Sequence, residues 1–136
     1  MNSSDLAPRV QAILDVALHR HLGLVFDGHE NGAALAHFDV GPAHVALGGL
    51  HGGVLYALFD AVSMLSLLPS LDVSQHAVTH DLHVSMLSPV PAGARCRLEA
   101  RVVRLGRALA FLDAAARVDD RLVATARVTK SLTGPR

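Results

Sequence analysis

The sequence LHGGVLYALFDAVSMLSLL, residues 50–68, decides the fold of this chain. It is apolar on every side of a helix, yet Asp60 lies in its middle. Between Leu50 and Leu71 there is no other Asp or Glu and no Lys or Arg. A helix that is apolar all round must be covered all round, so we expect a central helix over about 52–68. Because an ionised carboxylate is costly in a dry core, Asp60 needs either a partner or a function.

Length and composition restrict the class of protein. The chain has 136 residues, 51% of them hydrophobic and 18% charged, which suits a single domain over 1–136 with a generous core or a buried subunit interface. Lys plus Arg equals Asp plus Glu, so there is no global basic field and we expect no nucleic-acid partner. A helix from Val54 to Leu68 is about 22 Å long, whereas a bilayer core is about 30 Å thick, so we expect no membrane span.

The N-terminus and the cysteine content predict the compartment. MNSSDLAPRV lacks a basic segment followed by an apolar run, so we see no signal peptide. The single cysteine, Cys96, excludes an internal disulfide and fits a reducing compartment, so we predict a cytoplasmic protein. Its neighbours Arg95 and Arg97 could lower the pKa of the thiol, but a small core residue on a strand is the simpler interpretation.

Periodicity predicts the other elements. Helical spacing covers 5–22, with Ser4 or Asp5 as the N-cap and Gly23 as the stop. Alternation of apolar and polar residues predicts strands joined by short turns, which implies antiparallel neighbours. The expected strands are one that begins at VFD and others at about 33–40, 77–88, 95–102, 108–118 and 122–131. A strongly curved antiparallel sheet wrapped around the apolar helix satisfies both patterns, which makes this an α+β fold.

Three interpretations of Asp60 stay open on the residue alone. It is a structural acid bonded to nearby groups, a wet residue at a subunit seam, or a functional base. The tripeptide His51-Gly52-Gly53 adds information, because it stands where a loop becomes a helix. The first N–H groups of a helix lack internal partners, and glycine lets a ligand approach the backbone, which suits a developing oxyanion.

The spacing of these groups predicts an oligomer. Gly52 and Asp60 are eight residues apart, about 12 Å along a helix axis. One chain therefore cannot place both on a single carbonyl group, and a joint site requires at least a dimer. Apolar composition is compatible with this, since obligate interfaces resemble a core.

The segment HGGVLYALFDAV resembles the signature of hotdog-fold acyl-CoA thioesterases of the PaaI-like, phenylacetate-pathway type. The resemblance continues through AVTHDLHVSMLSPVPAG, VVRLGRALAFLDAAARV and LVATARVTKSL, and covers about residues 40–132 in order. It implies the hotdog fold, a curved antiparallel sheet around a central helix. It also implies hydrolysis of an acyl-CoA or aryl-CoA thioester by a homodimer or a tetramer of two dimers, with no cofactor.

The resemblance also implies roles for particular residues. Gly52 would offer its backbone N–H to the thioester oxygen, Asp60 would be the catalytic carboxylate, and His51 would shape the loop. Thr79 would position water or the carboxylate. Four residues would bind the substrate: Gly53, Ser88, Arg104 and Arg107. Ser88 and the two arginines would lie near the CoA, and Arg104 or Arg107 would contact its phosphates.

One position departs from the family pattern. Such enzymes often carry Asn or Gln six residues before the histidine of HGG, and here that position is Val45. His44 is adjacent and could substitute if the loop is shifted by one residue. An apolar acyl cavity is suggested by Ala57, Leu58, Met64 and Met86.

Two other function classes stay open. The first is a non-catalytic acyl-CoA or acyl-carrier binding module, which Val45 favours and Asp60 opposes. The second is a dehydratase acting on hydroxyacyl thioesters, whose histidine motif is absent. No GxSxG or P-loop pattern occurs, and despite nine histidines there is no HExxH motif, so we expect no metal.

Overall fold

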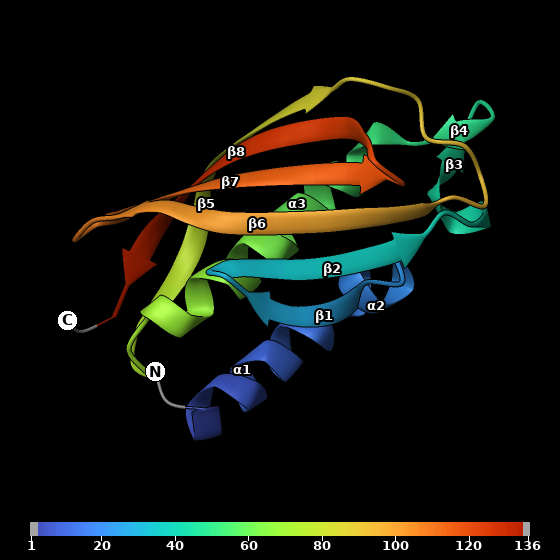
Figure 1. Cartoon of the computed structure of the whole chain (residues 1–136). Coiled ribbons are helices and arrows are strands. Elements are labelled where there is room, and N and C mark those ends of the chain that lie inside the picture. The colour runs from blue at the N-terminus through green and yellow to red at the C-terminus, as the bar shows by residue number, and fades with distance from the viewer. Residues whose placement is uncertain (1–2, 135–136) are drawn as a thin grey trace.

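The computed structural model describes residues 3–134, with side chains from residue 5 onward. The elements follow one another as short N-terminal helices, a first hairpin, a central helix and four long strands (Figure 1). Their bounds are α1 Ser3–Leu14, α2 Ala17–His21, β1 Val25–Glu30, β2 Ala33–Asp39, η1 Pro42–His44, β3 Val45–Ala46, β4 Gly49–Leu50, α3 Gly52–Leu67, η2 Leu68–Ser70, β5 His76–Met86, β6 Arg95–Leu105, β7 Leu109–Val118 and β8 Arg121–Thr133. The prediction of one domain over 1–136 also includes residues 1–2 and 135–136, which lie outside the described residues.

Six strands form one antiparallel sheet in the order β1-β2-β6-β7-β8-β5. The sheet curves around α3, which crosses its concave face (Figure 1). The predicted α+β arrangement, a curved antiparallel sheet around a central apolar helix, is therefore confirmed. The central helix was expected over about 52–68 and is observed over Gly52–Leu67.

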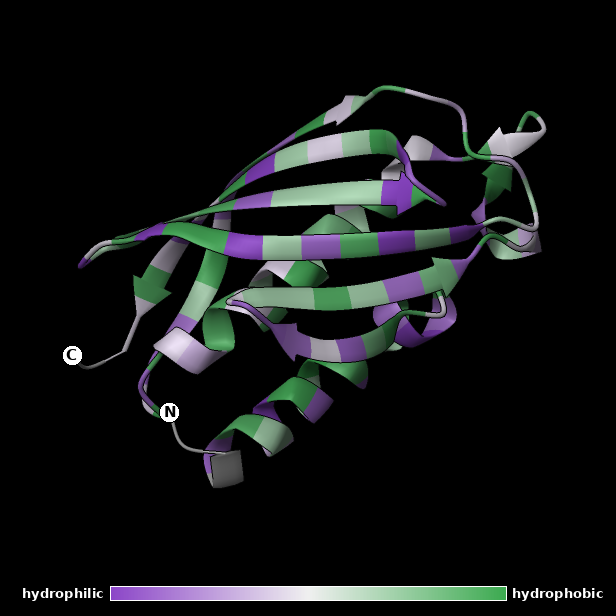
Figure 2. Cartoon of the chain, in the orientation of Figure 1, coloured by the Kyte–Doolittle hydropathy of each residue, from purple (hydrophilic) through white to green (hydrophobic). Residues whose placement is uncertain are grey.

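Alternation along the strands explains which face of the sheet meets the helix. The polar and apolar bands alternate along β6 (Figure 2), where Arg95 and Arg97 are exposed and Cys96 and Leu98 are buried. Small side chains on the last two strands let sheet and helix approach closely, as the sequence predicts. The buried alanines there are Ala110, Ala114, Ala116, Ala124 and Ala126.

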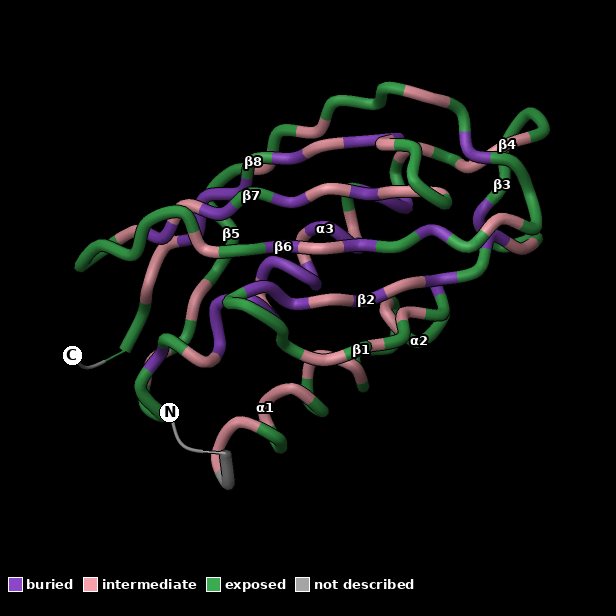
Figure 3. Tube along the Cα trace, in the orientation of Figure 1, coloured by how far each residue is buried: buried purple, intermediate pink, exposed green. Residues whose placement is uncertain are grey.

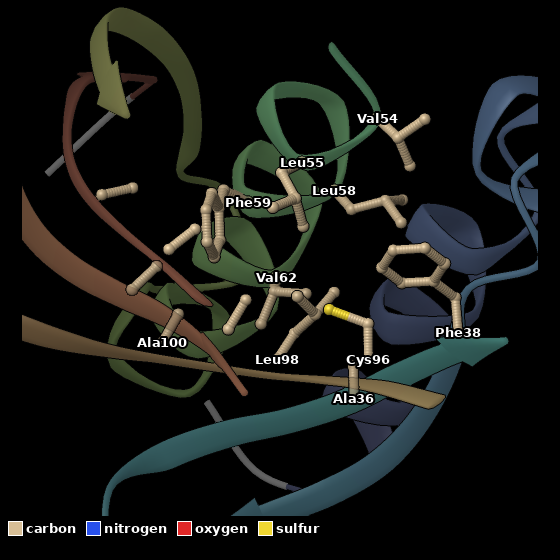
Figure 4. Close-up of a cluster of buried hydrophobic side chains, with 14 of the residues drawn as sticks. Ala36, Phe38, Val54, Leu55, Leu58, Phe59, Val62, Cys96, Leu98 and Ala100 are labelled. Atoms are coloured by element: carbon tan, nitrogen blue, oxygen red, sulfur yellow. The ribbon is translucent and has the colours of Figure 1, made fainter. Parts of the chain in front are cut away.

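The core lies between α3 and the inner face of the sheet. From α3, Leu55, Leu58, Phe59 and Val62 are all 0% exposed. They face side chains of β2 and β6 such as Phe38 (Figure 4), and most residues of α3 are buried (Figure 3). Burial of each such side chain contributes about 1.5–3 kcal/mol to the free energy of unfolding, so packing of α3 against the sheet is a major source of stability.

The window Gly52–Ser70 is long and apolar enough to cross a membrane by length and composition, and 61% of it is buried inside this structure. The sheet and the neighbouring helices supply that cover. In the structure this segment is the core helix that the sequence predicts.

The expected first helix over 5–22 is wrong in its middle and at its start. It begins at Ser3, so neither Ser4 nor Asp5 precedes it, and it divides into α1 and α2. Val16 is extended, with φ −56° and ψ 127°, and interrupts the helical backbone. The Nδ1 atom of His19 lies 2.7 Å from the Ile13 carbonyl oxygen, so this side chain replaces a backbone partner at the break. The predicted stop is confirmed at Gly23, which has φ +71°.

A two-residue turn joins β3 to β4 just before the site. Leu47 and Gly48 form this turn with φ 54° and 88°, and Leu47 is fully exposed. Positive φ at both central residues matches the twist of a hairpin and favours Asn-Gly. The turn between β1 and β2 has this favoured Asn-Gly sequence, with Asn31 and Gly32 at φ 51° and 78°. Leu47 is therefore strained for a residue with a branched side chain.

We expect Leu47→Asn to raise the free energy of unfolding by about 1 kcal/mol, because asparagine tolerates this backbone conformation better. Asn31→Leu is the matched control and should lower it by a similar amount. Denaturant unfolding at one fixed protein concentration measures both. A loss of stability in Leu47→Asn would show that the exposed leucine makes a contact that outweighs its strain.

Candidate functional site

The start of α3 is built around His51, which is its N-cap. The Nδ1 atom of His51 accepts a hydrogen bond from the Gly53 N–H at 2.9 Å, and the His51 carbonyl accepts one from Val54 at 3.0 Å. A Cβ at position 53 would lie 3.0 Å from the His51 ring, so a larger residue there would push the capping ring out of place by a few tenths of an ångström. Gly53 thus gives room to the histidine cap, and its N–H is already bonded.

Gly52 is the donor that this arrangement leaves free. Within residues 3–134, its N–H has no hydrogen-bond acceptor. Gly52 is partly exposed, and a Cβ there would meet only Met86, at 3.9 Å. A single unpaired N–H at the positive end of a helix can stabilise a developing oxyanion.

Asp60 lies on α3 two turns after Gly52, at the border between core and solvent. Its side chain is 44% exposed. Its Oδ1 atom accepts a hydrogen bond from the hydroxyl of Thr79 on β5 and one from the ammonium of Lys130 on β8, the latter at 2.8 Å. Lys130 also donates to Thr79 Oγ1 at 2.9 Å. The expected proximity of Thr79 to Asp60 is present in the structure.

Lys130 is the residue that the sequence analysis missed. It is the only lysine of the chain, and its side chain is 3% exposed. It follows Ala126 and Val128 on the inward-facing alternation of β8, where a charge is out of place. That pattern, one lysine on the apolar side of a strand, is the signal that could have identified it.

A pocket of about 390 Å³ opens beside Asp60. Apolar residues of three elements form most of its wall, with one histidine. These residues are Ile13, His19, Ala61, Met64, Ala77 and Val78, and Asp60, Thr79 and Lys130 complete the wall. Of the residues expected to form an acyl cavity, Met64 is in this wall, whereas Leu58 is 0% exposed in the core and Met86 lies at Gly52, the other end of the helix.

The suggestion that His44 replaces the missing polar group is not supported by the geometry. His44 is buried at 7% exposure. Its Nδ1 accepts from the Gly41 N–H at 2.9 Å, and its Nε2 lies 2.7 Å from the Leu22 carbonyl oxygen. Nδ1 therefore closes the loop on itself, Nε2 ties it to the N-terminal segment, and neither ring nitrogen is free. Val45 is 37% exposed and offers no polar atom.

The residues expected near CoA divide between the two ends of α3. Ser88 donates its backbone N–H to Val123 at 3.2 Å and lies at the Gly52 end. Arg104 and Arg107 flank Leu105, and neighbouring strands place Leu105, Ala110, Lys130 and Thr79 in one row across the sheet. Both arginines are exposed, and neither has a hydrogen bond or ion pair within the described part of the chain. The two arginines thus belong to the Asp60 end.

The structure explains the shifted pKa values of two further groups, Cys96 and Asp81. Burial raises the pKa of the Cys96 thiol to about 12, so the simpler interpretation of Cys96 is confirmed and the adjacent arginines do not activate it. Asp81 bonds to His80 at 2.8 Å, and this bond lowers the pKa of its carboxyl. Among residues 3–134 no three His, Cys, Asp or Glu side chains are grouped to hold a metal ion.

Comparison with known proteins shows the family to which this chain is similar. A model of the thioesterase superfamily matches residues 47–115, just over half of the chain, and this match includes the α3 N-terminus and both Asp60 and Thr79. Human acyl-coenzyme A thioesterase 13 is 33% identical over 89 residues, which are 64% of this chain and 63% of that protein. The mouse protein of the same name is 31% identical over 88 residues, 63% of this chain and 62% of that protein. The chain thus spans less than two thirds of the length of these relatives.

Solved structures confirm the hotdog fold. The PaaI protein of the E. coli phenylacetic acid degradation operon has a TM-score of 0.85 at 21% identity, over 97% of this chain and 96% of that one. A putative thioesterase from Ralstonia eutropha, described as phenylacetic acid degradation-related, has a TM-score of 0.82 at 27% identity, over 93% and 98%.

Proposed function

This chain belongs to the thioesterase superfamily, and from this membership we propose that it hydrolyses acyl-CoA or aryl-CoA thioesters to a free acid and CoA. The observation that carries the proposal is the carboxylate of Asp60, half-exposed in the wall of an apolar pocket and fixed through one oxygen. The pocket suits an acyl or aryl group, and the carboxylate suits the attack on its carbonyl carbon.

A thioester is already activated, so the reaction needs a polarised carbonyl, a carboxylate and a water molecule. In the proposed reaction, Asp60 takes a proton from water while the water oxygen attacks the carbonyl carbon, or Asp60 attacks that carbon and forms an anhydride that water then opens. The C–S bond breaks in either case, and the thiolate of CoA leaves and takes up a proton. The Gly52 N–H would stabilise the oxyanion. No cofactor enters this scheme.

We propose that each site is shared between two copies of the chain. The helix from Gly52 to Leu67 is unbroken, so the Gly52 and Asp60 backbones are about 12 Å apart along its axis. β5 is an edge strand and could pair with a second copy. One copy would then supply Asp60 and Thr79, and its partner would supply Gly52.

The residues proposed to bind CoA follow the same division. Arg104 and Arg107 would come with Asp60, and their free guanidinium groups suit phosphates. Ser88 would come with Gly52 from the partner, and the histidine cap His51 would hold that loop. A tetramer of two such dimers and a cytoplasmic location stay predictions; light scattering checks the first, and a free buried cysteine is compatible with the second.

Val45 supports a second candidate, a module that binds acyl-CoA without hydrolysing it. With His44 bonded on both ring nitrogens, the loop contributes no side-chain donor to the carbonyl. Thiol release from a panel of acyl-CoA and aryl-CoA thioesters separates the two functions. Release establishes the hydrolase, and the preferred thioester defines the acyl group. Binding of the same thioesters without release would replace the hydrolase with the binding module.

A further inference from the structure

Lys130 is buried beside the proposed catalytic carboxylate, and its role is not given by the fold. Its side chain is only 3% exposed. A buried ammonium is costly unless it is paired and hydrogen-bonded. The pairs that it makes are Asp60 Oδ1 at 2.8 Å and Thr79 Oγ1 at 2.9 Å, two of its three possible bonds.

Both donors converge on one oxygen of Asp60. Thr79 and Lys130 each donate to Oδ1, whereas Oδ2 receives no hydrogen bond from the described residues. A carboxylate held at one oxygen by a hydroxyl and an ammonium cannot rotate freely. The other oxygen is then the one free to act on water or on the thioester.

We infer that Lys130 is a positioning residue for the proposed hydrolysis: it holds the Asp60 carboxylate in one rotamer, with Oδ2 directed to the reacting atoms. This inference rests on the proposed function. Lys130 also lines the pocket, but its side chain is 3% exposed and its ammonium is bonded to Asp60 Oδ1 and Thr79 Oγ1. In this scheme it therefore acts through Asp60 and touches no substrate atom. Pre-organisation of this kind affects turnover more than substrate binding.

The competing interpretation is that Asp60 is only the counter-ion of Lys130. The two burial values argue against it, since Lys130 is almost fully enclosed but the Asp60 side chain is 44% exposed at the pocket. A carboxylate that served only to neutralise the lysine would gain most by being enclosed with it. Its exposure keeps one oxygen accessible.

Lys130→Met removes the charge and keeps an unbranched side chain. We expect kcat for the preferred thioester to fall on the order of 10²-fold, with little change in KM, because only the orientation of Asp60 is lost. Arg127→Met is the matched control, since it removes an exposed cation from the same strand that pairs with Asp113 and not with Asp60. Should Lys130→Met fail to fold, Lys130→Gln replaces it and should show the same loss of kcat.

A second measurement is independent of activity. As the only lysine, Lys130 gives a single Nζ signal in protein labelled with ¹⁵N-lysine. We expect its ammonium protons to exchange slowly in the wild type and faster in Asp60→Asn, as the ion pair requires. Wild-type kcat in a folded Lys130→Met variant, or a rapidly exchanging ammonium in the wild type, would overturn the positioning role alone. A wild type that releases no thiol from any thioester would reject the proposed function, and the positioning role with it.

Discussion

Asp60→Asn should lower kcat by about 10²–10⁴-fold, since the amide can neither take a proton from water nor attack the thioester carbon. Thiol release from the preferred thioester measures this loss. The amide still fits the space of the carboxylate and can accept a hydrogen bond, so the pocket keeps its shape. A variant with kcat within a few-fold of wild type would reject Asp60 as the catalytic carboxylate.

Asp60→Asn also lowers the stability of the fold, and this effect must be separated from its effect on catalysis. It leaves the Lys130 ammonium, which is 3% exposed, without an anionic partner. We expect a loss of about 1–3 kcal/mol in the free energy of unfolding, at the lower end because the amide oxygen can still accept a bond. Reduced activity in Asp60→Asn could then reflect partial unfolding.

The double variant Asp60→Asn/Lys130→Met separates these effects. It removes both charges together, so no uncompensated ion remains, and it should be more stable than Asp60→Asn alone. Its activity should nevertheless stay as low as that of Asp60→Asn. Recovery of activity with stability would mean that Asp60 serves only to neutralise the lysine.

Much of the fold follows from local pattern. The central helix and the boundaries of the long strands were predictable within a few residues, because apolar periodicity and turn residues act locally. The break at Val16 was not, since the helical spacing of apolar residues continues through it. At the break the His19 side chain bonds to the Ile13 carbonyl, and the spacing of apolar residues carries no information about that polar bond.

The site shows the same limit. The capping role of His51 and the exposure of Gly52 follow from the position of the HGG segment at a helix start. The bond of His44 to Leu22 and that of Lys130 to Asp60 span 22 and 70 residues of the chain, so spacing could not reveal them. Lys130 could have been suspected from its position on the inward side of β8, but its bond to Asp60 depends on how β8 passes the helix.

Gly52→Pro tests the oxyanion donor by removing one N–H group. Proline is favoured at the first position of a helix, and His51 before it has φ −69° and ψ 123°, which a residue before proline readily adopts. A Cβ at position 52 would meet Met86 at 3.9 Å, an ordinary van der Waals contact. We expect kcat to fall by about 10²–10³-fold with the helix intact. Gly52→Ala is the control, because it adds a Cβ and keeps the N–H; an equal loss there would assign the effect to bulk.

Mixing the two inactive variants tests whether the site is shared. An equal mixture of Asp60→Asn and Gly52→Pro chains, allowed to exchange subunits, forms about one half mixed dimers. Each mixed dimer has one site with both wild-type groups and one with neither, so activity should recover to roughly a quarter of wild type. If Asp60 and Gly52 of one chain served the same substrate, every site would carry a defect and mixing would restore nothing.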